Sequence, residues 1–251
     1  MRFILVPLSI KETMLYCQKT SLPLARSKPR IDDRLAQKAA KTWSAWTKSD
    51  VQWKRKIVGW ANTAMERISY EEWSLKTIPA KHAHLRRTAE KQPVSVEEIE
   101  KHNLDTENII VEYPGTMLTT AQAMDRLKGL SQKGRSYHNR YFWLSAIGAP
   151  LTLPMAALPV IPNLPGFYLL FRAWSHWKAL EGAKHLSYLV DDDHLALQDN
   201  ARLNKLFLEH QESKGTAALK ENEIDELAEE LGASEMASEL HRALKQVQKL
   251  K

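Results

Sequence analysis

A stretch of 31 residues without a charged side chain or a histidine dominates this 251-residue sequence. It runs from Tyr141 to Phe171, and 21 of the 31 residues are apolar. Because 26% of the whole chain is charged, a uniform composition would place roughly eight charges in a window of this length. The stretch also exceeds the ~20 residues that an apolar helix needs to cross a bilayer. We therefore expect insertion into a membrane, with a buried hairpin in a soluble domain as the alternative.

Five prolines prevent one straight helix across this stretch, because each removes a backbone donor and disfavours helix at the preceding residue. We predict two helices, over residues 141 to about 158 and 166 to about 186, joined by a bent connector over 159–165. Non-helical backbone at membrane depth must be covered by protein or water, so this connector should lie against other helices, against a partner or near the far interface. In an assembly, Asn163 and the carbonyls before the prolines are suited to bind a weakly hydrated cation, so the candidate bend or ion-pathway residues are Pro159, Pro162, Asn163 and Pro165.

Aromatic and basic side chains border both ends of the uncharged stretch. This combination is typical of the headgroup region of a bilayer. Basic residues outnumber acidic ones on both flanks, so the positive-inside rule keeps both ends on one side of the membrane. The sequence thus predicts a hairpin that enters and returns rather than a single crossing. The expected membrane-rim residues are Arg140, Trp143, Arg172 and Trp174.

The formal net charge of +6 is divided unevenly along the chain. Residues 1–190 contain 28 basic and 16 acidic residues, whereas residues 191–251 contain 8 basic and 14 acidic residues. The basic part suits an anionic lipid surface, which would repel the acidic part. We therefore expect a basic body with strands and helices over 1–140, a membrane hairpin with its following helix over 141–190, and an acidic helical tail over 191–251.

The remaining patterns predict a mainly α-helical fold with a small two-stranded β element. Apolar runs over 3–8 and 108–113 are typical of strands, and the turn dipeptide Pro114-Gly115 follows the second run. Such a pair needs helices packed against it for stability. The predicted helices cover 32–48, 51–78 and 94–102 in the body, and 195–211, 223–231 and 234–249 in the tail, with Gly232 as a C-cap.

The sequence contains none of the short motifs of nucleotide-binding loops, hydrolase elbows, zinc proteases or dithiol redox sites. Its single cysteine, Cys17, rules out an internal disulfide and a four-thiolate metal site. His82 and His84 lack further ligands at a suitable spacing, and the acidic run 191–193 lacks the glycine of a calcium loop. We therefore expect no enzyme activity, no cofactor and no metal site. Nucleic acid is not expected as a partner, because no recognition motif accompanies the basic charge.

The order of these parts resembles the mitochondrial potassium/proton exchange-related family. The resemblance rests on the N-terminal strand MRFILVPLS followed by a helix at Tyr16-Cys17, the Tyr-Pro-Gly at 113–115 and the segment IPNLPGFYLLFRAWSHWKALEGAKHL over 161–186. It implies an integral protein of the inner mitochondrial membrane, with its body on the matrix side. It also implies that the protein is required for electroneutral potassium/proton exchange and organelle volume. It assigns no role to an individual residue.

One hairpin is too little to enclose an ion path, whereas several hairpins in an assembly can do so. We therefore expect a subunit or regulator of exchange in a homo-oligomer or larger membrane complex. Its expected partners are anionic membrane lipids, with potassium ions and protons as the candidate transported species. The alternative is a peripheral lipid-binding scaffold or interaction protein of mitochondria.

Overall fold

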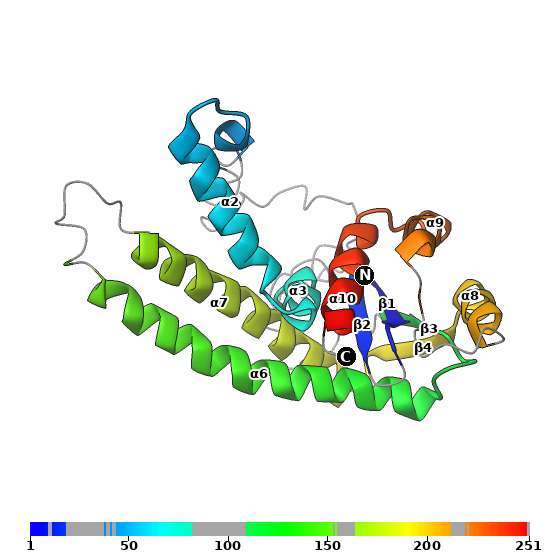
Figure 1. Cartoon of the computed structure of the whole chain (residues 1–251). Coiled ribbons are helices and arrows are strands. Elements are labelled where there is room, and N and C mark those ends of the chain that lie inside the picture. The colour runs from blue at the N-terminus through cyan, green and yellow to red at the C-terminus, as the bar shows by residue number, and fades with distance from the viewer. Residues whose placement is uncertain are drawn as a thin grey trace, which may run out of the picture. The chain divides into compact units, whose positions relative to one another are not determined.

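The computed structural model describes residues 1–9, 12–18, 38, 41, 44–81, 109–152, 154, 164–211, 219 and 221–249. The chain divides into two compact units, one of residues 1–20 with 70–251 and one of residues 21–69. The larger unit contains a sheet, a long helical hairpin and the C-terminal helices (Figure 1). The helix predicted over 94–102 lies outside the described residues.

The smaller unit contains α2 (Gln52–Glu66). Val51 precedes this helix in an extended conformation, and the Ser49 hydroxyl accepts a hydrogen bond from the Val51 amide. The helix predicted over 51–78 is interrupted, because α2 ends at its C-cap Arg67 and a new helix begins at Tyr70. This new helix, α3 (Tyr70–Thr77), belongs to the larger unit.

Four strands form one sheet in the order β2-β1-β3-β4. They are β1 (Arg2–Pro7), β2 (Thr13–Gln18), β3 (Ile109–Tyr113) and β4 (Leu195–Asp199). β1 pairs antiparallel with β2 and parallel with β3, and β3 pairs parallel with β4. The predicted pairing of 3–8 with 108–113 is confirmed, but the β element has four strands instead of two. The helix expected at Tyr16-Cys17 is wrong, because these residues pair with β1 as part of β2. Along β1, Ile4 and Val6 enter one core and Phe3 enters the other, so both faces of the sheet are covered.

The uncharged stretch lies in a helical hairpin formed by α6 (Thr120–Leu151) and α7 (Leu164–Asp191). At the start of α6 the Thr119 hydroxyl accepts from the Gln122 amide, and the Gln122 side chain accepts from the Thr119 amide. Two helices lie at the ends of the stretch as predicted, but their bounds differ from 141 to about 158 and 166 to about 186. α6 already begins at Thr120, because residues 120–149 contain no proline, and α7 extends to Asp191. None of the helices in the described ranges is long and apolar enough to cross a membrane.

α3 packs against the hairpin at two glycines that allow a close approach. At Gly182 of α7, a Cβ atom would lie 1.9 Å from the carbonyl oxygen of Leu75. At Gly134 of α6, a Cβ atom would lie 2.5 Å from Leu75 Cδ1. Leu75 is 1% exposed and belongs to the core between the sheet and the hairpin. The two glycines thus bring α3 within reach of polar side chains on both hairpin helices.

The helices that follow β4 pack on the other face of the sheet. They are α8 (Ala201–Gln211), a 3-10 turn (Glu221–Glu223), α9 (Ile224–Glu230) and α10 (Met236–Lys249). Met236 and Leu240 of α10 are fully buried in one core with Ile4 of β1. The predicted helices over 223–231 and 234–249 are confirmed, and Gly232 has the positive φ, 64°, expected after a helix end.

The predicted helix over 195–211 is wrong in its first part. Residues 195–199 form β4, and α8 begins at Ala201. Asn200 separates the two elements, because its side-chain oxygen accepts hydrogen bonds from the amides of Arg202 and Leu203. Pairing with β3 thus outweighs the helical preference of the leucines and alanine in this segment.

Candidate functional site

Five polar side chains lie together where α3 meets the hairpin. They are Glu72 of α3, His138 of α6, and Arg172, Ser175 and His176 of α7. Glu72 and His176 are 2% exposed, and His138 is 3% exposed. We call this set the buried ionic cluster. Burial of ionisable groups is unfavourable unless they are paired, so such a set is a candidate functional site.

Glu72 is the anion of the cluster. Arg172 donates from Nη1 to Oε1 at 2.9 Å and from Nη2 to Oε2 at 3.0 Å. The Ser175 hydroxyl donates to Oε1 at 2.6 Å. Burial raises the pKa of Glu72, but the hydrogen bonds from Arg172 and Ser175 outweigh burial and hold this pKa below its usual range. Glu72 is therefore ionised at neutral pH.

Lys76 of α3 places a second cation beside the cluster. Its ammonium group donates to the Ser175 hydroxyl at 3.0 Å and lies 3.8 Å from the ring centroid of Trp73. Burial lowers the pKa of Lys76 to about 8, although the negative charge of Glu72 opposes this shift. At neutral pH, Lys76 and Arg172 together thus provide two cations for one carboxylate.

The two histidines are hydrogen-bonded to each other across the hairpin. His138 Nδ1 lies 2.9 Å from His176 Nδ1, and Arg172 Nη2 lies 2.8 Å from His176 Nε2. A guanidinium group only donates, so Nε2 of a neutral His176 accepts and its proton is on Nδ1. That proton is donated to Nδ1 of His138, whose own proton is then on Nε2. The geometry therefore assigns one tautomer to each neutral ring.

Burial lowers the pKa of both His138 and His176 to about 4. The positive charge of Arg172 adds to this shift, whereas the carboxylate of Glu72 opposes it. Both imidazoles are consequently neutral at pH 7 in this arrangement, as the tautomers require.

Glu72, His138 and His176 also offer ligand atoms within 4.8 Å of one another, close enough for a metal ion. The charges argue against a metal. Arg172 already binds both carboxylate oxygens and His176 Nε2, and Lys76 adds a further positive charge. A divalent cation would increase a buried positive charge that only one carboxylate balances. The cluster is therefore better explained by hydrogen bonds among the protein side chains than by a metal site.

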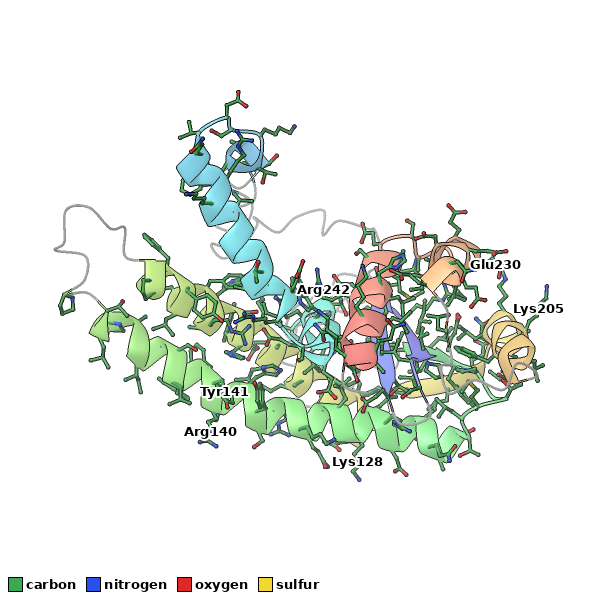
Figure 2. All side chains as sticks on the ribbon, viewed as in Figure 1. Lys128, Arg140, Tyr141, Lys205, Glu230 and Arg242 are labelled. Atoms are coloured by element: carbon green, nitrogen blue, oxygen red, sulfur yellow. The ribbon has the colours of Figure 1, made fainter. Side chains whose placement is uncertain are left out.

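The structure distributes the predicted rim residues between the surface and the interior. Arg140 is exposed and points outward from α6 (Figure 2), and Trp143 is 57% exposed. Arg172 instead points into the buried ionic cluster, where its side chain is 14% exposed and pairs with Glu72. Trp174 is half-buried. The sequence predicted a membrane-rim position for Arg172 because its ion-pair partner, Glu72, is 100 residues away and leaves no local signal.

Of the predicted bend and pathway residues, Pro165 is exposed in the first turn of α7. Pro159, Pro162 and Asn163 lie outside the described residues, so their role stays a prediction. Sequence reasoning missed the other members of the buried ionic cluster. The one signal for it was the spacing of Arg172 and His176, four residues apart on one helix face.

The end of the hairpin that is distant from the sheet (Figure 1) exposes large apolar side chains. Seven of them are between 47% and 76% exposed. They are Trp143, Leu144, Ile147, Leu151, Phe167, Tyr168 and Leu170. We call this surface the apolar end. A group of exposed apolar side chains of this size marks contact with a membrane or another protein.

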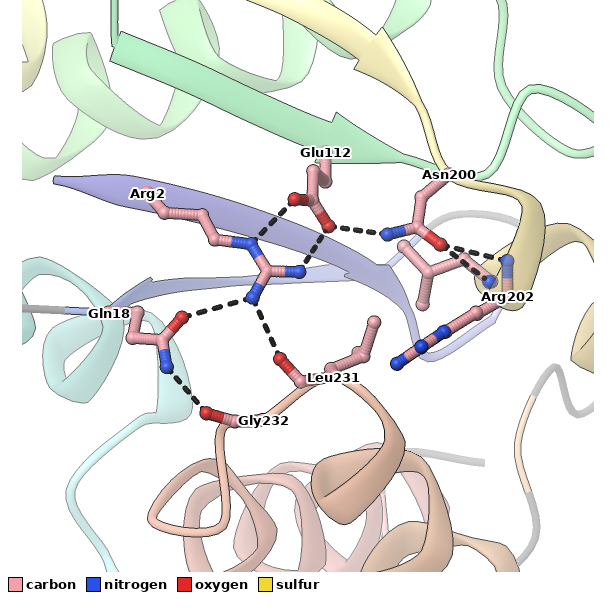
Figure 3. Close-up of polar contacts among 8 residues, drawn as sticks. Arg2, Gln18, Glu112, Asn200, Arg202, Leu231 and Gly232 are labelled. Carbon is pink, nitrogen blue, oxygen red and sulfur yellow. Dashed lines mark hydrogen bonds and ion pairs between the residues drawn. The ribbon is translucent and has the colours of Figure 1, made fainter.

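A second polar network joins the C-terminal helices to the sheet (Figure 3). Arg2 of β1 makes two contacts of 2.6 Å with the carboxylate of Glu112 on β3 and donates to the Leu231 carbonyl at 2.7 Å. Asn200 also donates to Glu112. Burial raises the pKa of Glu112, but these hydrogen bonds outweigh burial and lower it. The network fixes Leu231 next to the first strand, which is a structural role.

The fold and the site define a class of protein in which a helical hairpin with an apolar end packs on a four-stranded sheet and is joined to α3 by a buried ionic cluster. The chain belongs to the mitochondrial K+-H+ exchange-related family, whose family model matches residues 2–190. The resemblance noted from the sequence is thereby confirmed. The match contains β1, β2, β3 and α6 and ends before β4.

Two fungal proteins are similar to the chain. One, an uncharacterized protein of Saccharomyces cerevisiae, is 32% identical over 197 residues, which are 74% of this chain and 61% of the yeast protein. The other, an uncharacterized protein of Schizosaccharomyces pombe, is 31% identical over 206 residues, which are 82% of each chain. The alignment thus spans less than two thirds of the Saccharomyces protein. No solved structure matches the chain.

Proposed function

We propose that this protein is a membrane-associated component of mitochondrial potassium/proton exchange, acting as a subunit or regulator within an assembly. Membership of the K+-H+ exchange-related family supports a role in this process. A complete carrier surrounds its ion path with several membrane-embedded helices. The described residues supply one helical hairpin, so in this proposal further copies of the chain or other subunits complete the path.

The apolar end is the observation that supports contact with a membrane. From Tyr141 to Leu151, α6 rises about 15 Å, half of the ~30 Å thickness of the hydrocarbon core. This length fits insertion into one leaflet. Trp143 and Tyr168 are amphipathic aromatic residues suited to the headgroup boundary, and the exposed Arg140 precedes the apolar end on α6.

Anionic lipid is the partner that the charges of α6 favour. Asp125 is the single acidic residue of this helix, whereas four of its basic residues are exposed. They are Lys128, Lys133, Arg135 and Arg140. Each basic residue near an anionic surface contributes about 1 kcal/mol of attraction. We place the apolar end in the inner mitochondrial membrane and the sheet on the matrix side, in agreement with the positive-inside rule.

Swelling of isolated mitochondria in potassium acetate tests the function. Mitochondria that lack the protein should swell slowly, and nigericin, an artificial potassium/proton exchanger, should restore swelling. Normal swelling without the protein would refute the proposal.

Variants of the apolar end connect this function to membrane contact. Leu144→Glu with Ile147→Glu should fail to restore swelling, because a charge at the centre of a membrane helix is unfavourable by about 2.5–3.5 kcal/mol. Leu208→Glu changes an exposed leucine of α8 and should restore swelling, so it is the matched control. Equal rescue by both variants would show that the apolar end does not contact the membrane.

Reconstitution separates a subunit of the carrier from a regulator or scaffold. If copies of this chain form the path, purified protein in liposomes should produce proton flux driven by a potassium gradient. Binding to the liposomes without flux at any protein density would leave a regulator or a peripheral scaffold.

A further inference from the structure

The tautomers of His138 and His176 leave no free position for another proton. Two neutral rings carry two protons on four nitrogen atoms. Both acceptor nitrogens are occupied, because Arg172 donates to His176 Nε2 at 2.8 Å and His176 donates to His138 Nδ1 at 2.9 Å. A third proton at either position would place two N–H donors against each other. Moving protons between the rings only transfers the conflict to the other contact, so the pair cannot bind a proton with both contacts intact.

Proton binding requires one of these two hydrogen bonds to break, and both of them help to pack the hairpin. The contact between the two histidines joins α6 to α7. The contact between His176 and Arg172 opens only if Arg172 moves, and Arg172 is held by Glu72 of α3 at 2.9 and 3.0 Å. Proton binding therefore loosens either the two hairpin helices from each other or the hairpin from α3.

The groups that face the histidine pair come from all three helices. From α3, the carboxylate of Glu72 attracts a proton and the ammonium group of Lys76 repels it. From α7, Arg172 repels a proton, and Ser175 is neutral. From α6, two tyrosine rings lie near His176, with centroids 6.1 and 5.6 Å from the imidazole centroid. These rings belong to Tyr137 and Tyr141.

We propose that the His138–His176 pair is a proton-binding site coupled to hairpin packing. It takes up one proton when α3, α6 and α7 loosen around it and releases that proton when they close. Linkage is reciprocal, so insertion of the apolar end into lipid would raise the proton affinity of the pair if insertion loosens the hairpin. The role of this site in potassium/proton exchange rests on the proposed function, whereas the coupling itself does not.

Imidazole ¹⁵N NMR of the purified full-length chain between pH 8 and pH 4.5 tests the coupling. At pH 8 the two rings should show different neutral tautomers, with the proton on Nδ1 in His176 and on Nε2 in His138. On acidification they should titrate together, at least one pH unit below the exposed-histidine range near 6.5. The protection of the α7 backbone amides against hydrogen exchange, relative to the intrinsic exchange rate at each pH, should fall in the same step. Independent titration near pH 6.5 with unchanged protection would overturn the proposal.

Two variants distinguish the clash between two N–H donors from simple charge repulsion as the cause of the low proton affinity. Arg172→Gln replaces an obligatory donor by an amide that can also accept, so His176 should gain a proton without a loss of this protection. Lys76→Gln removes an equal charge that faces the pair but donates to neither ring. In this control, the histidine pair should titrate at higher pH, and its titration should still be accompanied by a loss of hydrogen-exchange protection in α7. If both variants behave alike, charge repulsion explains the titration and the proposal is wrong.

A third variant covers the case in which Arg172→Gln does not fold. His138→Asn retains an acceptor at the position of Nδ1 and removes one titrating ring, so His176 should keep its tautomer and still resist protonation. Loss of that tautomer would overturn the assignment. The swelling assay is independent of these measurements, because normal swelling without the protein refutes the proposed function and leaves the NMR result intact.

Discussion

Replacing Arg172 by leucine tests whether the buried ionic cluster anchors the hairpin to α3. The substitution removes two hydrogen bonds, of 2.9 and 3.0 Å, from Glu72, whose side chain is 2% exposed. Removal of one partner of a buried ion pair lowers the free energy of unfolding by about 3–5 kcal/mol. We expect about 3 kcal/mol, the lower end of this range, because Ser175 still donates to the carboxylate at 2.6 Å and Lys76 remains nearby.

The opposite substitution, Glu72→Leu, should lower the free energy of unfolding by less, about 1–2 kcal/mol. The Arg172 side chain is already 14% exposed and long enough to turn its charge toward water, which Glu72 is not. The double variant Glu72→Leu/Arg172→Leu removes both charges and should lie within about 2 kcal/mol of the unmodified protein. The predicted order of the two single variants follows directly from their unequal burial.

Urea unfolding of the full-length chain at pH 7.5, followed by circular dichroism and by tryptophan fluorescence, measures these differences. The dependence of the unfolding free energy on urea concentration should be the same for all variants, so that midpoints can be compared. If Arg172→Leu is as stable as the unmodified protein, or less destabilised than Glu72→Leu, the pair does not anchor the hairpin.

Three further predictions use the same unfolding measurement. Gly182→Ala should lower the free energy of unfolding by more than about 2 kcal/mol, because its Cβ would lie 1.9 Å from the backbone of α3. Gly129→Ala has no atom within 4 Å of its Cβ, so it should raise the free energy of unfolding by about 0.5–1 kcal/mol. The pKa of His138 and His176 falls from 6.5 to about 4 on folding, so their contribution is complete above pH 6.5 and is lost as pH falls toward 4. Each histidine contributes a loss of about 3 kcal/mol over this range, so His138→Asn, which removes one of the two, should roughly halve the fall in stability between pH 7 and pH 5. Arg2→Met should lower the free energy of unfolding by about 1–3 kcal/mol, since its guanidinium binds a carboxylate of β3 and a carbonyl after α9; an unchanged value would make this network dispensable.

Local patterns were sufficient for the elements whose structure depends on neighbouring residues. The apolar runs over 3–8 and 108–113 gave the correct pairing of β1 and β3. β1 is buried on both faces and is continuously apolar, whereas β3 buries Ile109, Val111 and Tyr113 and exposes Ile110. The last two helices were predicted from Gly232 and the amphipathic spacing on either side of it. In both cases the signal lies within about ten residues of the element that it describes.

Elements and sites that depend on distant partners could not be predicted. The segment Leu195–Asp199 has a composition compatible with helix and becomes a strand because β3 offers an open edge. The buried ionic cluster joins Glu72 to Arg172, which is 100 residues away, and joins His176 to His138 on the opposite helix of the hairpin. Only the fold brings these groups together, so Arg172 alone resembled a basic residue at a membrane surface.

The position of β1 in the middle of the sheet imposes an order of assembly on the chain. β1 and β2 can form a hairpin as soon as residues 1–18 are available, but the face of β1 that carries Ile4 and Val6 is covered by helices from the far end of the sequence. Contacts between such distant segments form slowly, and apolar strands left uncovered in the meantime are prone to aggregation. In a chain that emerges N-terminus first, this face of β1 therefore stays uncovered until α8, α9 and α10 are available. Truncation before Met236 would remove Met236 and Leu240 from the core over this face and should lower the yield of folded protein.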